Sequence, residues 1–319
     1  MWWDRPNPKN GPGAEPKPFP FMNIRWVGFI VTAIILVGTT VSLATQGLNL
    51  GLDFTGGVQI EGRSTTGAPI DSGVVRAKIA EAGFEESNVT TTDGGATVVI
   101  RVPRNEELTV EEVARRVTAT LTSSGIEQRK VDNVEGRVSD KLLMQGIIAS
   151  ILAVAGIGAY VWFRFEVKFG TGAFVTTFHD VYAVLGLFSI TQMTFDLTIV
   201  AGVLTVAGYS INDTVVVYDR IREMLKKYKK LAIAEVIDIS ITSTLSRTLI
   251  TSLATGLAAM AMAFLGGPVL FGFAISIIFG IIIGTYSSIF VAAPMLIHLP
   301  GRLPGAKYQN PDGTVSAAP

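Results

Sequence analysis

Cysteine is absent from the 319 residues, and histidine occurs only twice, at His179 and His298. Without cysteine the chain can form no disulfide bond, no thiolate nucleophile and no cysteine-ligated metal centre. Two histidines this far apart in the sequence do not predict a metal site. The GxxxxGK[ST] phosphate loop, the HExxH zinc motif and the serine nucleophile elbow are also missing. We therefore expect no enzyme active site and no cofactor, and ATP is not expected to be the energy source.

Charged residues are scarce as well, at 16% of the chain, whereas about 25% is typical of soluble proteins. Hydrophobic residues make up 49% and are concentrated in separate blocks, an arrangement that is typical of a membrane protein. The net charge is zero, so the composition does not favour a nucleic-acid partner. The sequence thus predicts an α-helical, polytopic membrane protein in contact with lipid.

Six blocks are long enough to cross a hydrocarbon core of about 30 Å as helices. The first covers residues 24–45, and the others cover residues 142–163, 169–190, 196–218, 248–265 and 269–299. The chain is thus expected to consist of a disordered tail (1–23), the first helix (24–45), a folded domain (46–140), five further helices (141–299) and a second tail (300–319).

Lysine and arginine in the short connections predict the orientation. Both tails and the connections at 164–168 and 220–230 carry basic residues, whereas the turns at 191–195 and 266–268 carry none. Both termini are therefore expected to be cytoplasmic. The domain at residues 46–140 is then expected to lie outside the cytoplasm.

The sequence of this outer domain predicts a clear order of strands and helices. Alternation predicts strands at 57–63, 88–92, 96–103 and 126–134, with a hairpin turn at Asp93-Gly94-Gly95. Helices are predicted at 71–82 and after the capping box at 109–112. Strand, helix, strand, strand, helix, strand is the pattern of an α+β ferredoxin-like domain.

Asp213 is the candidate functional residue, because it lies inside the apolar body of the fourth helix. It precedes the inner end at Asp219 by six residues, or about 9 Å, too far for an aspartate side chain to reach water. A carboxylate at such a position is costly and by default indicates function, often in proton transfer; the alternative is a hydrogen bond that locks the helix and has no role in transport. Asp196 is expected to cap the outer end of this helix, and Asp219 to form an ion pair at its inner end.

Neighbouring residues predict how this helix is packed. Small and polar residues recur at three- and four-residue spacing beside Asp213: Ala201, Thr205, Gly208 and Asn212. Such a stripe favours close helix packing, either within this chain or against a partner half. Tyr209 is placed one turn before Asp213, where it could donate a hydrogen bond to the carboxylate, although a tyrosine in a span more often serves packing. Arg247, at the start of the fifth predicted helix, is the expected countercharge, although an arginine there could instead reach toward lipid headgroups.

Two further helices carry polar or small residues. His179 and Asp180 are near the middle of the third helix, where they could relay protons or serve as structural polar contacts. The sixth helix carries small residues at every fourth position, which predicts tight packing: Gly272, Ser276, Gly280, Gly284 and Ser288. Pro294 is expected to kink or loosen its inner end.

Four motifs together resemble the SecF family. They are GLDFTGG at 51–57, GYSINDTVVVYDR at 208–220, SRT at 246–248 and GTYSS at 284–288. The resemblance extends from about residue 24 to residue 300. It implies a bacterial inner-membrane subunit of the RND-type superfamily that promotes preprotein export with SecD, using the proton-motive force, beside the SecYEG channel and possibly YajC.

The resemblance also implies roles for particular residues. Asp213 corresponds to the family's proton-linked aspartate and Arg247 to its arginine, while Asp219 and the His179-Asp180 pair match family positions. Because RND-type machines join two six-helix halves, an obligate heterodimer with SecD is expected. Asp53, Gly56 and Gly57 are expected to form the hinge between the first helix and the outer domain.

Two other functions are compatible with a six-helix membrane protein. An RND-type exporter of small molecules or lipids would need a larger outer domain with an apolar pocket. A structural scaffold would tolerate neutral residues at positions 213 and 247. Identifying the proteins that copurify with the chain would distinguish these functions from preprotein export.

Overall fold

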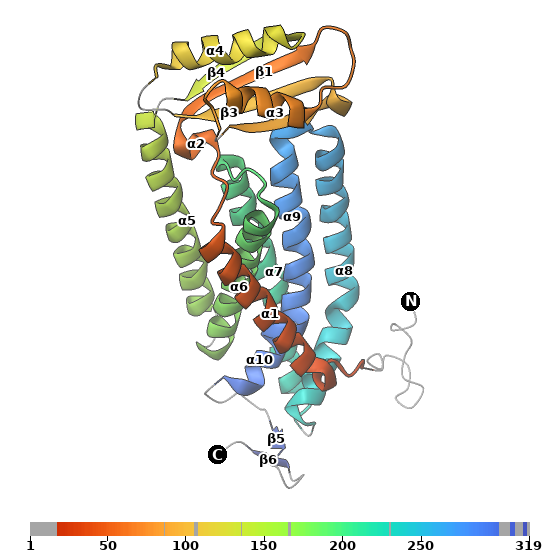
Figure 1. Cartoon of the computed structure of the whole chain (residues 1–319). Coiled ribbons are helices and arrows are strands. Elements are labelled where there is room, and N and C mark those ends of the chain that lie inside the picture. Colours follow the sequence, from red (N-terminus) through yellow and green to blue (C-terminus); the bar gives the residue numbers. More distant parts are fainter. Residues whose placement is uncertain are drawn as a thin grey trace.

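The computed structural model describes residues 18–85, 87–104, 108–134, 136–164, 167–229, 231–299, 307–309 and 315–317. Six helices in this part are long and apolar enough to cross a membrane, and they run side by side as a bundle (Figure 1). A four-stranded sheet with two helices covers one end of the bundle. The start of the first helix lies at the opposite end.

Most bundle helices begin and end close to the predicted positions, and the largest differences are at the ends of α7 and α8 away from the sheet domain. Their bounds are α1 (Arg25–Thr45), α5 (Gly136–Arg164), α6 (Val167–Thr191), α7 (Leu197–Lys227), α8 (Ile233–Leu265) and α9 (Gly267–Ser287). On the inner side α7 continues nine residues past 218, and α8 begins fifteen residues before 248. These extensions have polar residues on one side, so hydropathy alone underestimates their length.

The outer domain has the predicted ferredoxin-like topology. Its elements are β1 (Gly57–Ser64), α3 (Ser72–Glu81), β2 (Asn88–Thr92), η3 (Asp93–Gly95), β3 (Thr97–Pro103), α4 (Val110–Ser123) and β4 (Ile126–Val134). The strands pair antiparallel in the order β2-β3-β1-β4. Thr109 caps α4 by accepting a hydrogen bond from the backbone N–H of Glu112, as the capping box predicts.

The core of this domain is formed by alternate residues of the sheet and by one face of each helix. Ile60, Ile100, Ile79 and Val117 are fully buried there. Helix α5 begins at Gly136, directly after β4, so the domain ends a few residues before the expected boundary at 140. The last strand is therefore joined to the bundle by a very short connection.

At both chain ends, some of the residues that were expected to form tails have defined secondary structure. The 3₁₀ helix η2 (Phe21–Ile24) buries Phe21 and Met22, and the Met22 N–H donates to the Asp238 carboxylate of α8 at 2.9 Å. Residues 21–23, which were expected to belong to the disordered tail, are therefore part of the folded structure. Within 300–319, β5 (Lys307–Gln309) pairs with β6 (Val315–Ala317), and the remaining residues of both tails lie outside the described part.

The sixth spanning segment changes its winding near its inner end. Helix α9 passes into the π-helical turn η4 (Ser288–Ala292) and then into α10 (Ala293–His298). The Ala293 N–H bonds to the Ser288 carbonyl, five residues back, directly before Pro294. Pro294 lacks a backbone N–H and cannot donate a hydrogen bond to the preceding turn. This accounts for the π-helical winding, at the inner end where the sequence predicted a kink or loosening.

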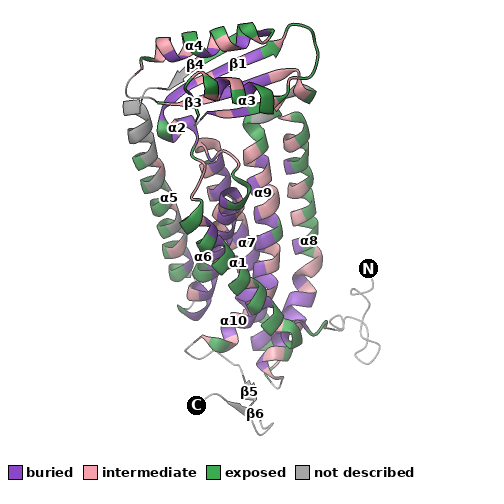
Figure 2. Cartoon of the chain, viewed as in Figure 1, coloured by how far each residue is buried: buried purple, intermediate pink, exposed green. Residues whose placement is uncertain are grey.

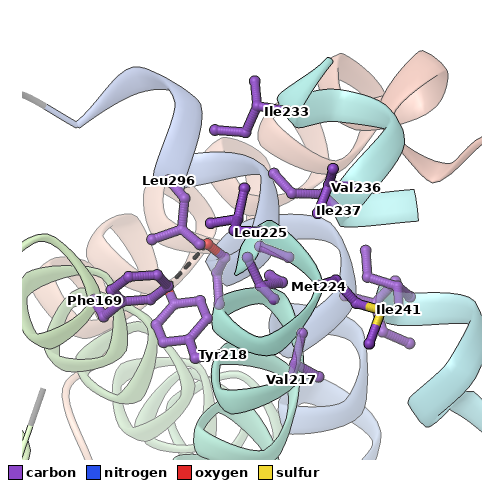
Figure 3. Close-up of a cluster of buried hydrophobic side chains, with 14 of the residues drawn as sticks. Phe169, Val217, Tyr218, Met224, Leu225, Ile233, Val236, Ile237, Ile241 and Leu296 are labelled. Carbon is purple, nitrogen blue, oxygen red and sulfur yellow. Dashed lines mark hydrogen bonds between the residues drawn. The ribbon is translucent and has the colours of Figure 1, made fainter. Parts of the chain in front are cut away.

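Tyr218 joins this irregular segment to α7. Its side chain is fully buried in the inner cluster of α6, α7, α8 and α10, which Figure 3 shows, and its hydroxyl donates to the Ala292 carbonyl at 2.9 Å. Gly172 of α6 is so close that a Cβ there would lie 2.3 Å from the same hydroxyl oxygen.

The Tyr218→Phe variant tests this bond. We expect the free energy of unfolding to fall by about 1 to 3 kcal/mol, because a buried carbonyl loses its hydroxyl partner. Thermal unfolding of the purified protein in detergent measures the change. Tyr160→Phe is the control, since Tyr160 is largely exposed on the bundle surface. An equal loss in both variants would contradict the assignment.

Candidate functional site

Asp213 is held between three helices in the interior of the bundle. Its side chain on α7 is only 6% exposed. Oδ1 accepts a hydrogen bond from Thr248 Oγ1 of α8 at 2.8 Å, and Oδ2 accepts one from Ser288 Oγ at 2.7 Å, where α9 passes into η4. The carboxylate thus links α7 to both neighbours, and a change in its charge would alter both contacts.

Arg247 does not form the expected ion pair with Asp213 in this structure. Arg247 is exposed, and among the described residues no ion pair joins the two side chains. Thr248, the next residue, faces Asp213 instead, because consecutive helix residues point about 100° apart. The nearest partners of the carboxylate within this chain are therefore neutral hydroxyl groups.

Tyr209 does not reach Asp213 either. Its hydroxyl forms a hydrogen bond with Ser252 Oγ of α8 at 3.0 Å, and Ser252 in turn bonds to Thr285 of α9 at 2.8 Å. This chain of hydroxyl groups joins the same three helices on the outer side of Asp213. Tyr209 therefore contributes to packing of the site without touching the carboxylate.

The small and polar stripe beside Asp213 is exposed in this chain. All four of its residues are exposed: Ala201, Thr205, Gly208 and Asn212. A Cβ at Gly208 would meet no atom within 4 Å. The stripe therefore packs against no helix among the described residues and forms an open face of α7.

The small residues of α9, by contrast, pack against α7. A Cβ on Gly280 would lie 2.2 Å from Val206 Cγ2, and one on Gly272 would lie 3.0 Å from Ile199. Ser276 approaches Gly202, and Gly284 approaches Ser210. Helices α7 and α9 are therefore in close contact along their length, and this contact carries Ser288 to Asp213.

His179 and Asp180 form a second polar cluster on α6. Both are buried, and His179 Nδ1 lies 2.8 Å from Asp180 Oδ1. Asp180 Oδ2 also accepts hydrogen bonds from Ser210 of α7 and, at 2.7 Å, from Ser287 of α9. Both ionisable groups face the same interior, which their spacing on a helix did not guarantee.

The predicted hinge is an ordered connection between the outer domain and α7. Asp53 lies in the short helix α2 (Leu52–Thr55), and its Oδ2 accepts a hydrogen bond from the Leu197 N–H at 3.0 Å. Gly56 and Gly57 have φ values of 67° and 132°, which favour glycine. A Cβ on Gly57 would also lie 2.2 Å from the Val102 carbonyl oxygen.

The two carboxylates at the ends of α7 are placed as the sequence predicts. Asp196 caps the outer end by accepting from the Ile199 N–H at 3.1 Å. Asp219 is exposed, with its Oδ1 3.5 Å from Arg222 NH1. These contacts account for both carboxylates structurally, which leaves Asp213 as the buried one of the three.

Sequence reasoning missed the hydroxyl groups that solvate the buried carboxylates. Ser288 was expected only to pack helices, Thr248 was noted only as part of the SRT motif, and Ser210 and Ser287 were not singled out. The available signal was that Ser210 precedes Asp213 by one turn and that Ser287 adjoins Ser288. Among the described residues, no group of three or more histidine, aspartate or glutamate side chains is arranged to hold a metal ion.

Comparison with known proteins assigns the chain to a family. The family described as "Protein export membrane protein SecD/SecF, C-terminal" matches residues 114–302, and the SecD/SecF GG motif matches residues 41–61. The protein translocase subunit SecF of Pseudomonas aeruginosa is 42% identical over 88% of this chain and 90% of its own length. The Haemophilus influenzae subunit is 40% identical over 86% and 85%, respectively.

A solved structure shows the same architecture. The crystal structure of SecDF from Thermus thermophilus, a translocon-associated membrane protein, matches with a TM-score of 0.78 and 32% identity. The match covers 88% of this chain and 38% of the SecDF chain, so this chain spans well under half of that protein. Sequence, helix count and fold agree, and the chain belongs to the SecF family of protein translocase subunits.

Proposed function

We propose that this Sec translocase auxiliary subunit pairs with SecD and uses the proton-motive force to promote preprotein export. The observation that carries the proposal is Asp213, a carboxylate enclosed in the bundle and bonded to hydroxyl groups of two neighbouring helices. Burying an ionised carboxylate at this position costs free energy, and such a cost is expected only where protonation of the group has a function. The proton is the coupling ion, and no other cofactor is needed for this step.

Protonation changes the hydrogen bonds that hold Asp213. The ionised carboxylate only accepts hydrogen bonds, whereas the protonated group also donates one. Either Thr248 or Ser288 must then reorient or move away. Since these residues belong to α8 and to the start of η4, uptake and release of one proton would alternate between two packings of α7 against its neighbours.

A shift of α7 can reach the outer domain by a short path. The outer end of α7 is bonded to the segment before β1, through Asp53 to Leu197 and through the Gly51 N–H to the Phe195 carbonyl at 2.7 Å. Gly56 and Gly57 follow directly. This continuity supports a function in which the 46–140 domain moves with α7 and engages the preprotein outside the cytoplasm, with both termini in the cytoplasm.

The open face of α7 is the proposed contact with SecD. It is exposed, small and polar, adjoins Asp213, and lies near the exposed Arg247. A polar face is unfavourable toward lipid and favourable toward another helix. The SecDF relative, whose chain is much longer, makes a second helical half plausible as the cover. SecYEG, YajC and the preprotein are the other proposed partners.

The Gly208→Leu variant tests this contact. We expect it to reduce copurification of SecD with the chain by about tenfold or more, because a loss of about 1.4 kcal/mol of binding free energy at the helix interface has that effect. The chain alone should keep its stability, since nothing lies within 4 Å of the position. Gly38→Leu on α1, equally open, is the matched control. Full retention of SecD by Gly208→Leu would contradict the proposed face.

Export itself tests the proposed function. Membrane vesicles that contain the translocase are compared with and without this chain, at constant ATP, before and after an uncoupler dissipates the proton gradient. The chain is expected to increase preprotein transport only while the gradient is present. An increase that survives the uncoupler would contradict proton coupling, and copurification with small-molecule efflux components would favour the exporter.

A further inference from the structure

Asp180 is more deeply enclosed than Asp213. Its side chain is 0% exposed and interacts with groups from three helices: His179 on α6, Ser210 on α7 and Ser287 on α9. Gly284, one turn before Ser287, lets these helices approach, since a Cβ there would lie 3.4 Å from Ser210 and 3.9 Å from Asp180 Oδ2. The proposed function assigns no role to this second buried carboxylate.

The two carboxylates are connected by adjacent residues. Ser287 bonds to Asp180, and Ser288, the next residue, bonds to Asp213. The π-helical turn begins at Ser288. π-Helical turns are uncommon and often occur at functional sites. A change in the protonation of either carboxylate therefore acts on the junction of α9 and η4, where the winding already departs from an α-helix.

Three polar atoms in this region point to bound water. His179 Nε2, Thr177 Oγ1 and Thr214 Oγ1 are buried, and none has a hydrogen-bond partner among the described residues. Thr177 and Thr214 are 3% and 0% exposed, and His179 is 3% exposed. Buried polar groups in proteins are nearly always satisfied, commonly by ordered water, which is also the simplest carrier of a proton.

We propose that Asp180 is a second proton-binding site of the bundle, coupled to Asp213 through Ser287 and Ser288. This inference rests on the proposed function. An excess proton relayed along buried water adds to an Asp180 carboxylate oxygen and leaves the water neutral; the new O–H needs an acceptor, so one of the serine donors of Asp180 must turn. When the proton returns to the water, the original bonds form again. If Ser287 turns, the segment that also carries Ser288 moves, and the hydrogen bond of Ser288 to Asp213 changes with it.

The ionisable groups of the two proposed sites lie on three packed helices, α6, α7 and α9. They are Asp180 and His179 on α6, Asp213 on α7 and Tyr286 on α9, whose ring hydroxyl donates to the Gly28 carbonyl of α1. Helix α1 packs on α6 through Thr39 and Ser42, which do not titrate. Arg247 of α8 also acts electrostatically on Asp213, so the coupling involves two carboxylates, one imidazole and one guanidinium.

Infrared spectroscopy of the purified complex in lipid tests the inference directly. The carbonyl band of protonated carboxyl groups is followed against pH in the wild type, in Asp180→Asn and in Asp213→Asn. We expect each variant to lose one titrating component and to move the midpoint of the other by about one pH unit, as strongly interacting sites do. An Asp180→Asn spectrum that titrates like the wild type would overturn the proposal.

Two further variants separate coupling from loss of structure. Ser189→Ala removes a buried serine of α6 that bonds only outside the cluster, to Ser42 and the Gly47 carbonyl, and should leave both midpoints unchanged. Ser287→Ala removes one hydroxyl and no charge, and it replaces Asp180→Asn if that variant does not assemble. It should move the midpoint of the Asp213 component, and an unmoved midpoint would overturn the coupling.

Export separates this inference from the proposed function. We expect Asp180→Asn to lose most of the gradient-dependent increase in transport. Gradient-dependent export in Asp213→Asn would contradict the proposed function itself. Loss in Asp213→Asn with full export and wild-type titration in Asp180→Asn would overturn only the second site.

Discussion

Asp213→Asn is expected to abolish the part of preprotein export that depends on the proton gradient. Asparagine has nearly the shape of the protonated aspartic acid and can still bond to Thr248 and Ser288, but it cannot lose a proton at physiological pH. The bundle is then held in the packing of α7 against α8 and α9 that belongs to the protonated state of residue 213. Transport in membrane vesicles should fall to the level that the wild type shows after an uncoupler is added.

The control for this variant is Glu223→Gln on the same helix. It removes the same charge, but Glu223 is exposed and pairs only with Arg220 at 2.8 Å, so its contribution to stability is small. Export and its gradient dependence should be unchanged. If Asp213→Asn reached the membrane at the wild-type level and kept its response to the gradient, Asp213 would not be the coupling residue.

Gly280→Ala is expected to lower both the stability of the bundle and its gradient-dependent function. The new Cβ would lie 2.2 Å from Val206 Cγ2, a distance that forces α9 away from α7. Overpacking of this kind costs about 1 to 3 kcal/mol of the free energy of unfolding. The same displacement weakens the bond from Ser288 to Asp213, so gradient-dependent export should also fall.

Unfolding of the purified protein in detergent, followed by circular dichroism, measures this effect. Gly156→Ala on α5 is the matched control, because a Cβ at Gly156 would meet nothing within 4 Å. Replacing a helical glycine by alanine without a clash is neutral or stabilising. A Gly280→Ala protein as stable as the control would show that the α7 and α9 backbones are not held at this distance.

The sequence predicts the architecture well, because the physical signals for it are local. Apolar blocks of about 20 residues need no tertiary information to be recognised as spanning helices. Alternation, the capping box at Thr109 and the glycines at 94 and 95 define the outer domain in the same way, and both glycines have positive φ. The cost of burying Asp213 also follows from its position in one helix.

Helix faces could not be assigned from sequence. The stripes of α7 and α9 both consist of small and polar residues at nearly the same spacing, yet the α9 stripe packs on α7 and the α7 stripe is open. A small residue permits close approach without specifying which helix approaches. Figure 2 shows the result, with buried residues concentrated on α6 and α7 and exposed ones on the outer faces of α1, α5 and α8.

By itself, the sequence determined that this chain crosses the membrane six times, carries a ferredoxin-like domain and holds a costly carboxylate at Asp213. Only the tertiary structure decided which groups surround that carboxylate: Thr248 and Ser288, but neither Arg247 nor Tyr209. It also brought Asp180 into the same network through Ser287. The reason is that hydrogen bonds between helices depend on rotation and depth to within about an ångström, which periodicity does not encode.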